Sequence, residues 1–100
     1  MSEARMAPQV LIPYDPREAI SIVEAALFAG VSRDTMKRWA DVKNIGRPVV
    51  GRWMVSRIAL QMLLDSNRKA LNAYLSGDRT SEIVQSYFRR AGLTSNTDAA

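Results

Sequence analysis

The chain has 100 residues, a formal net charge of +4, and neither cysteine nor histidine. This length suffices for one small domain with a single core. The missing cysteine excludes disulfides and thiolate chemistry, and the missing histidine removes the commonest metal ligand and the usual general base. The acidic residues form no tight pair in the sequence. We therefore expect neither an enzyme nor a metal or cofactor site.

The N-terminal segment, residues 1–19, holds three prolines and shows no sustained periodicity, so we expect a flexible arm. Within it, the apolar run at residues 10–12 is expected to add an edge strand or to cover the core. Asp15 is expected to cap a short helical turn that begins at Pro16. At the other end, residues 94–100 are small and polar, which predicts a disordered tail over residues 93–100 and leaves residues 20–92 as the folded domain.

Nothing in the chain suggests a membrane or an export route. The first residues lack the charged and then apolar pattern of a signal peptide. No apolar run approaches the roughly 20 residues that a membrane-spanning helix needs. We therefore expect a cytoplasmic protein without a membrane partner.

Two short helices are predicted next. Ser21 and Glu24 have the spacing of a capping box, and the helix that they start is expected to end near Ala29. Gly30 follows, where a left-handed residue can end a helix at low cost. Ser32 is the N-cap of a second helix, which we expect to run to Ala40 or Asp41.

A β-hairpin is predicted over residues 48–55. Two runs of β-forming residues flank Gly51 and Arg52, and glycine in the first position suits a two-residue type II′ turn. That turn sets Val50 opposite Trp53. Trp53 then either packs between the hairpin and the helices, which we favour, or stacks on a nucleic-acid base.

Ser56 is predicted to cap a long third helix that ends near residues 76–77, and a fourth helix is expected over about residues 80–91. The third helix has an apolar stripe around Asn67, formed by Leu60, Leu64, Leu71 and Tyr74. This stripe either forms a dimer seam in which Asn67 fixes the register, or is covered by the fourth helix within one chain. We favour cover within one chain.

Basic residues are concentrated between positions 33 and 57, where only Asp34 and Asp41 oppose them. The seven are Arg33, Lys37, Arg38, Lys43, Arg47, Arg52 and Arg57. Because the rest of the chain is close to neutral, this stretch creates a local positive field whose natural partner is a polyanion.

The second predicted helix fits a role in reading DNA. Met36 and Trp39 supply its apolar side, which leaves its outer side and leading turn polar. An α-helix fits the major groove of DNA, where Arg33 and Arg38 can bind guanine and Ser32 and Thr35 can bind phosphate. The alternative is a solvated face with an ion pair between Asp34 and Arg38.

Three segments, residues 20–26, 30–39 and 50–57, resemble the excisionase and MerR-like winged helix-turn-helix domains. The resemblance implies a mostly α fold with a β-hairpin wing, to which this chain would add two C-terminal helices. It places a recognition helix in the major groove and the wing on the backbone or in the minor groove. The DNA-binding residues would be Ser32, Arg33, Thr35, Lys37 and Arg38 on the helix, with Lys43, Arg47, Arg52 and Arg57 beside or on the wing. The chain departs from the family at Met54, where many relatives have a basic residue, and in the loop over residues 41–47.

The sequence thus predicts a protein that binds specific sequences of double-stranded DNA. An excisionase (a recombination directionality factor) of a phage or mobile element, or a related transcriptional regulator, fits best. Its copies would associate on adjacent DNA sites, bend the duplex and assist an integrase. The alternatives are a phage small terminase subunit, which would form a defined oligomer, and a helical protein–protein adaptor whose basic face meets an acidic partner.

Overall fold

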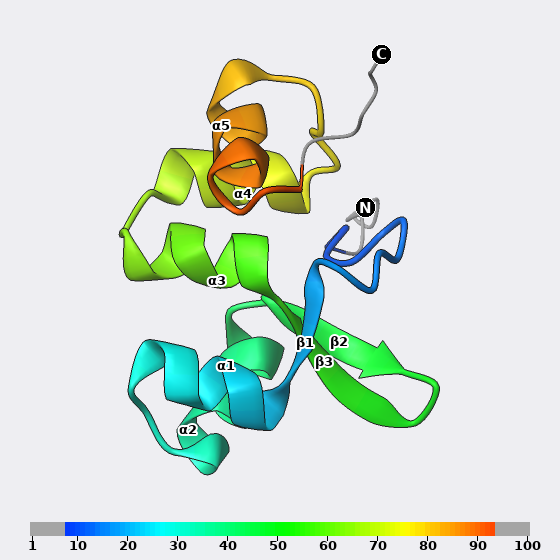
Figure 1. Cartoon of the computed structure of the whole chain (residues 1–100), viewed down its shortest axis with the longest axis vertical. Coiled ribbons are helices and arrows are strands. Elements are labelled where there is room, and N and C mark those ends of the chain that lie inside the picture. The colour runs from blue at the N-terminus through cyan, green and yellow to red at the C-terminus, as the bar shows by residue number, and fades with distance from the viewer. Residues whose placement is uncertain (1–7, 94–100) are drawn as a thin grey trace, which may run out of the picture.

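The computed structural model of the chain describes residues 8–93. These residues form a mostly helical domain with one three-stranded antiparallel sheet of order β1-β3-β2. The elements in chain order are β1 (Ala19–Ser21), α1 (Ile22–Ala29), α2 (Arg33–Val42), β2 (Gly46–Val49), β3 (Arg52–Ser56), α3 (Arg57–Leu64), α4 (Arg68–Leu75) and α5 (Glu82–Arg90). Helices α1 and α2 lie at one end of the molecule and α4 and α5 at the other, with α3 between them and the sheet beside α1 (Figure 1). Within the described part of the chain, no helix has the length and apolar character needed to cross a membrane.

The predicted pair of short helices is confirmed. Ser21 Oγ accepts a hydrogen bond from the Glu24 amide at 3.1 Å, and the Glu24 carboxylate accepts one from the Ser21 amide at 3.4 Å. Gly30 ends α1 in the left-handed region, with φ 74°. Because the amides of Gly30 and Val31 both donate to the Ala26 carbonyl, the chain reverses within three residues.

The predicted hairpin forms, but the predicted register was wrong, because the turn lies one residue earlier in the chain than expected. The turn consists of Val50 and Gly51, with φ values of 50° and 79°, and Val49 pairs with Arg52. Positive φ at both central residues is the pattern of a type I′ turn, in which glycine takes the second position instead of the first. Trp53 therefore lies opposite Pro48 instead of opposite Val50.

The predicted long third helix is divided into α3 and α4. Ser66 takes a positive φ of 58°, and Asn67 caps α4 by accepting a hydrogen bond from the Ala70 amide at 3.1 Å. The prediction failed because Asn67 fits the spacing of the apolar stripe and was therefore placed inside one helix. Asparagine is also a favoured N-cap residue, and that is its role here. The chain turns at this point, so α4 packs against α3.

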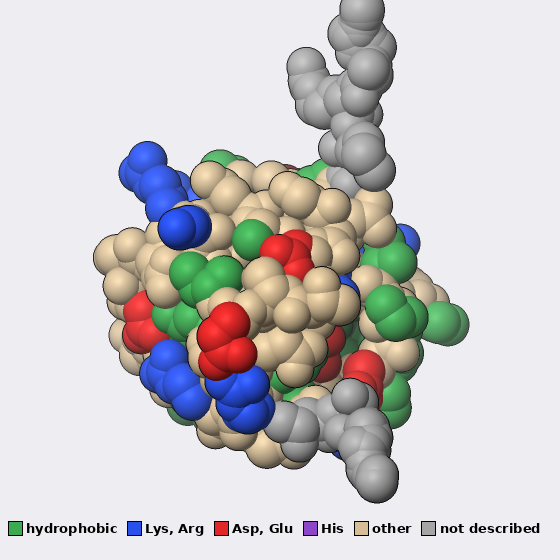
Figure 2. Space-filling model, turned by 90° about the horizontal axis from the view of Figure 1, so that it is seen from above, with side chains coloured by type: hydrophobic (Ala, Val, Ile, Leu, Met, Phe, Trp, Pro, Cys, Tyr) green, Lys and Arg blue, Asp and Glu red, His purple; other side chains and the backbone are tan. Residues whose placement is uncertain are grey.

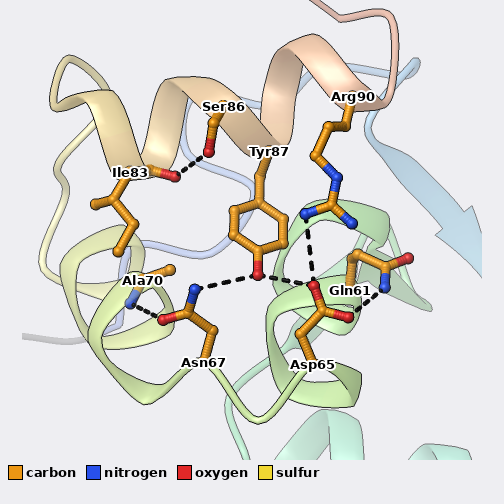
Figure 3. A network of polar contacts seen from close by, with 8 residues as sticks. All are labelled: Gln61, Asp65, Asn67, Ala70, Ile83, Ser86, Tyr87 and Arg90. Atoms are coloured by element: carbon orange, nitrogen blue, oxygen red, sulfur yellow. Dashed lines mark hydrogen bonds and ion pairs between the residues drawn. The ribbon is translucent and has the colours of Figure 1, made fainter.

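Helix α5 covers α3 and α4. Leu60, Leu71 and Tyr74 of the apolar stripe are buried within the chain, and Leu64 is exposed. The favoured alternative, in which the last helix covers the stripe, is therefore the one observed. Asn67 contacts α5 through its side-chain amide, which donates to the Tyr87 hydroxyl at 3.2 Å (Figure 3).

Much of the predicted N-terminal arm is packed against the domain. Val10 and Leu11 are buried in the core, and the Arg79 guanidinium donates to the carbonyl oxygens of Gln9 and Ile12 at 2.5 and 3.1 Å. The expectation of a flexible arm is therefore wrong for this part of the segment, and the expectation that the apolar run covers the core is confirmed for Val10 and Leu11, whereas Ile12 is exposed. The predicted turn at Asp15 forms, since its carboxylate accepts from the Arg17 amide at 2.8 Å. Residues 1–7 and 94–100, which include most of the predicted tail, lie outside the described residues.

Candidate nucleic-acid interface

The sequence of α2 separates a buried side from an exposed one. Met36 and Ala40 are buried, and the helical period therefore places Arg38 on the opposite side of the helix. Asp34 and Asp41, four and three residues away from Arg38, share that exposed side. The outer side of α2 thus has an arginine between two aspartates.

The first turn of α2 is fixed by its cap. Ser32 Oγ accepts from the Thr35 amide at 3.1 Å and donates to Thr35 Oγ1 at 3.0 Å. The predicted phosphate ligands Ser32 and Thr35 therefore bind each other, which leaves the Thr35 hydroxyl hydrogen as the donor of this pair. Arg33, the first helical residue, is exposed beside them.

A groove of about 330 Å³ runs between α2 and the hairpin. On the helix side it is lined by Asp34, Lys37, Arg38 and Asp41, and on the hairpin side by Trp53. An adjoining hollow shares Asp41 and Trp53 and adds Arg47. Trp53 is half-buried and packs against the core, in agreement with the favoured packing role, and it also lines the groove.

The hairpin presents its cations on one face. Arg47 pairs with Met54, and Val49 pairs with Arg52. Since side chains alternate along a strand and directly paired residues share a face, Arg47 and Arg52 lie on the same face of the hairpin. The turn of the hairpin projects away from the helices (Figure 1).

Within residues 8–93, the seven basic residues of this stretch form no ion pair. The alternative pairing of Asp34 with Arg38 is not observed, whereas ion pairs do form at Arg17–Asp15, Arg89–Glu82 and Arg90–Asp65. The end formed by α4 and α5 accordingly shows blue and red side chains next to each other (Figure 2). The cations of α2 and the hairpin form no such pairs within the described residues, although Asp34 and Asp41 line the groove beside Lys37 and Arg38.

The structure brings together only some of the predicted site residues. Lys37 and Arg38 line the groove beside Trp53, and Arg47 lines the adjoining hollow. Lys43 is the C-cap of α2, and its amide donates to the Trp39 carbonyl at 2.8 Å. Arg57 instead lines a separate hollow of about 220 Å³ with Phe28 and residues of α3 and α5.

Sequence reasoning missed the place of two residues. Asp41 was counted only as an opposing charge, although its spacing of three residues from Arg38 puts it on the exposed side of α2 with Arg38 and Asp34. Val50 was assigned to a strand and instead occupies the tip of the hairpin. Gly51 was the signal for that tip, because glycine suits either position of a two-residue turn.

The chemistry that this surface offers is recognition. Arginine can bind guanine through two hydrogen bonds, and aspartate can accept one from the amino group of cytosine. No group of three or more potential metal ligands occurs in the part of the chain that the structure describes. Comparisons of the chain with family models, curated proteins and solved structures give no match.

Proposed function

We propose that this chain is a double-stranded DNA-binding protein of the winged helix-turn-helix type. In this proposal α2 is the recognition helix and the β2–β3 hairpin is the wing. The observation that carries it is the pair of adjoining hollows that share Asp41 and Trp53, one lined by Lys37 and Arg38 and the other by Arg47. Within the described residues none of these three cations forms an ion pair. A concentration of cations outside ion pairs favours a polyanion.

The size and chemistry of α2 support its role. Its ten residues give a length of about 15 Å, and the major groove, about 12 Å wide, admits one helix. Arg38, at the middle of the exposed side, would bind guanine, while Asp34 and Asp41 would accept from cytosine on either side. The aspartates would repel phosphates and so keep this part of the helix on the base edges.

The wing would hold the duplex beside the helix. Arg47 and Arg52 share one face of the hairpin and would bind phosphates. Cations in this position contribute affinity for any sequence, whereas the residues of α2 select the sequence. The hairpin would therefore provide affinity, and α2 would provide sequence selectivity.

We infer that the biological role is positional. The resemblance of residues 20–57 favours an excisionase that binds adjacent sites, bends the duplex and helps an integrase to assemble. Bending a short site costs on the order of 1–6 kcal/mol, which several neighbouring copies can offset. A transcriptional repressor would use the same contacts.

A binding selection tests the proposal directly. The protein is incubated with a pool of random duplexes at low salt, and the retained DNA is sequenced. Tandem repeats are expected for an excisionase, and inverted repeats would indicate a dimeric repressor. If no sequence is enriched and no duplex is retained in a salt-sensitive way, the proposal is wrong and the basic surface meets a protein.

Substitution then assigns the recognition helix. Arg38→Ala is expected to weaken binding to the selected site by about 1–3 kcal/mol and to relax selectivity at one base pair. Arg68→Ala is the matched control, because Arg68 is also exposed but lies on α4. If Arg38→Ala selects the same DNA sequences as the wild-type protein, Arg38 does not contact the bases.

A further inference from the structure

The tip of the hairpin carries an apolar side chain in solvent. Val50 is 97% exposed, more than any other large hydrophobic residue in the described part of the chain. It makes no contribution to the core, because the hairpin turn projects from the body of the molecule (Figure 1). Folding therefore gives no reason for valine here.

The backbone gives a second argument against valine at this position. Val50 has a φ of 50°, in the left-handed region that β-branched residues rarely adopt. A type I′ turn favours asparagine or glycine at both central positions. Valine is thus unfavourable both for its exposure and for its conformation, and strain of this kind is concentrated at functional sites.

The residues around Val50 are cationic. Arg52 follows the turn directly, and Arg47 lies further along the paired strand on the same face of the hairpin. Both are exposed, and no described residue forms an ion pair with either. The tip therefore combines one apolar side chain with two flanking positive charges.

We propose that Val50 is a wedge that enters the minor groove of DNA and separates two stacked base pairs, while Arg47 and Arg52 bind the phosphates on either side. The inference rests on the proposed function and deepens it by naming the part of the duplex that the tip contacts. Apolar side chains of this size unstack a base step and kink the duplex toward the major groove. Inserting the exposed valine removes its surface from water, which accounts for its presence.

Val50→Asn tests the wedge without harming the fold, because asparagine suits the turn. The probe is a duplex of about 30 base pairs, taken from the binding selection, with donor and acceptor dyes at its ends and 2-aminopurine at successive steps. Wild-type protein is expected to bring the ends together and to raise the fluorescence at one step. Val50→Asn is expected to lose both signals and to bind about tenfold more weakly, while its melting temperature is unchanged or higher.

Two further variants make the test specific. Val50→Ile keeps a β-branched apolar side chain and is expected to keep the bend and the fluorescence signal. Leu27→Ala removes an apolar side chain that is 78% exposed on α1 and is expected to change neither. A loss of bending in Leu27→Ala as well would show that the effect is not particular to the tip, and would overturn the proposal.

The remaining outcomes separate the wedge from the function. If wild-type protein and Val50→Asn bend the duplex equally, the wedge is wrong and DNA binding stands. If wild-type protein binds no duplex, both proposals fall. If Val50→Asn binds the duplex normally but loses binding to vesicles of phosphatidylserine and phosphatidylcholine, the tip contacts a membrane surface and the wedge is wrong.

Discussion

At the scale of single residues, one buried carboxylate joins the N-terminal segment to the helices. Glu18 is 4% exposed, and its Oε2 accepts hydrogen bonds from Ser56 Oγ, at 2.5 Å, and from the Tyr74 hydroxyl. The same hydroxyl accepts from the Leu11 amide at 3.1 Å. Burial, together with the nearby Glu18 carboxylate, raises the pKa of Tyr74 well above its usual value. Tyr74 therefore keeps its proton and remains a donor to Glu18 throughout the physiological range.

Removing this hydroxyl should destabilise the whole domain. Tyr74→Phe leaves the buried Glu18 with one side-chain donor and the Leu11 amide without its acceptor, so the free energy of unfolding is expected to fall by about 2–3 kcal/mol. Urea unfolding measures this loss of free energy. Tyr14→Phe is the control, because Tyr14 is 48% exposed, and it is expected to leave the unfolding curve unchanged. Equal curves for the two variants would contradict the role given to Tyr74.

At the scale of elements, α5 is attached to the corner between α3 and α4 by a polar network. Asp65 Oδ2 accepts from the Tyr87 hydroxyl at 2.8 Å, and Asp65 Oδ1 accepts from the side-chain amide of Gln61 at 2.9 Å (Figure 3). The Arg90 guanidinium lies 3.5 Å from the same carboxylate and stacks over the Tyr87 ring. The hydrogen bond from Tyr87, followed by that from Gln61, lowers the pKa of Asp65 below its usual value of 3.8.

The lowered pKa of Asp65 predicts an acid-sensitive attachment of α5. Because the folded pKa lies below the unfolded one, the ionised carboxylate stabilises the fold above about pH 4, and this contribution is lost as the pH falls toward the folded value. Asp65→Asn is expected to lower the free energy of unfolding at pH 7 by about 1 kcal/mol and to flatten its decline in acid. The side chain is 32% exposed, so screening keeps the effect small.

The pH profile of unfolding provides the measurement, with Asp41→Asn as control. The Asp41 carboxylate has no hydrogen bond or ion pair within residues 8–93 and is exposed, so its replacement should leave the acid profile parallel to that of the wild type. If the free energy of unfolding of Asp65→Asn falls as steeply in acid as that of the wild-type protein, Asp65 does not cause the acid sensitivity.

Gly46 lies where β2 approaches both β3 and α2. A Cβ atom there would lie 2.4 Å from the carbonyl oxygen of Met54 on β3 and 3.0 Å from the Cβ of Ala40 on α2. Gly46→Ala is therefore expected to lower the free energy of unfolding by about 1–3 kcal/mol and to displace the hairpin from α2. In Gly92→Ala a Cβ meets nothing within 4 Å, so only its positive φ should matter, at about 1 kcal/mol or less. Thermal unfolding compares the two, and equal losses would exclude the contact as the cause.

Local signals explain which elements were predictable. The capping box at Ser21 and the stop at Gly30 act within four residues, so the sequence specifies α1 and the start of α2. The hairpin register was not predictable, because Gly51 suits the first position of a type II′ turn as well as the second position of the type I′ turn that is observed. Asn67 has its second partner, Tyr87, 20 residues away, and Leu11 contacts Tyr74 across 63 residues. Contacts at such separation leave no local pattern.

The candidate site was predictable in its composition and less so in its arrangement. Charge counting alone selects the stretch that contains Lys37, Arg38 and Arg47, because seven basic residues face only two aspartates between residues 33 and 57. It also selects Arg57, which the fold carries to a separate hollow beside α5. The position of Arg57 is set by the junction between β3 and α3, and counting charges along the sequence does not reveal where that junction places it.

At the scale of the whole molecule, the end formed by α4 and α5 has mixed charges (Figure 2), and the cations of α2 lie at the opposite end of the molecule (Figure 1). A cation that neutralises a phosphate releases a counterion, so each lost contact should reduce the slope of log affinity against log salt by about 0.9. Arg52→Gln is expected to show this reduction for every duplex sequence alike. Arg68→Gln, with the same loss of charge on α4, should keep the wild-type slope. Since both variants change the net charge equally, a reduction in both would mean that the total charge attracts DNA and that the hairpin makes no phosphate contact of its own.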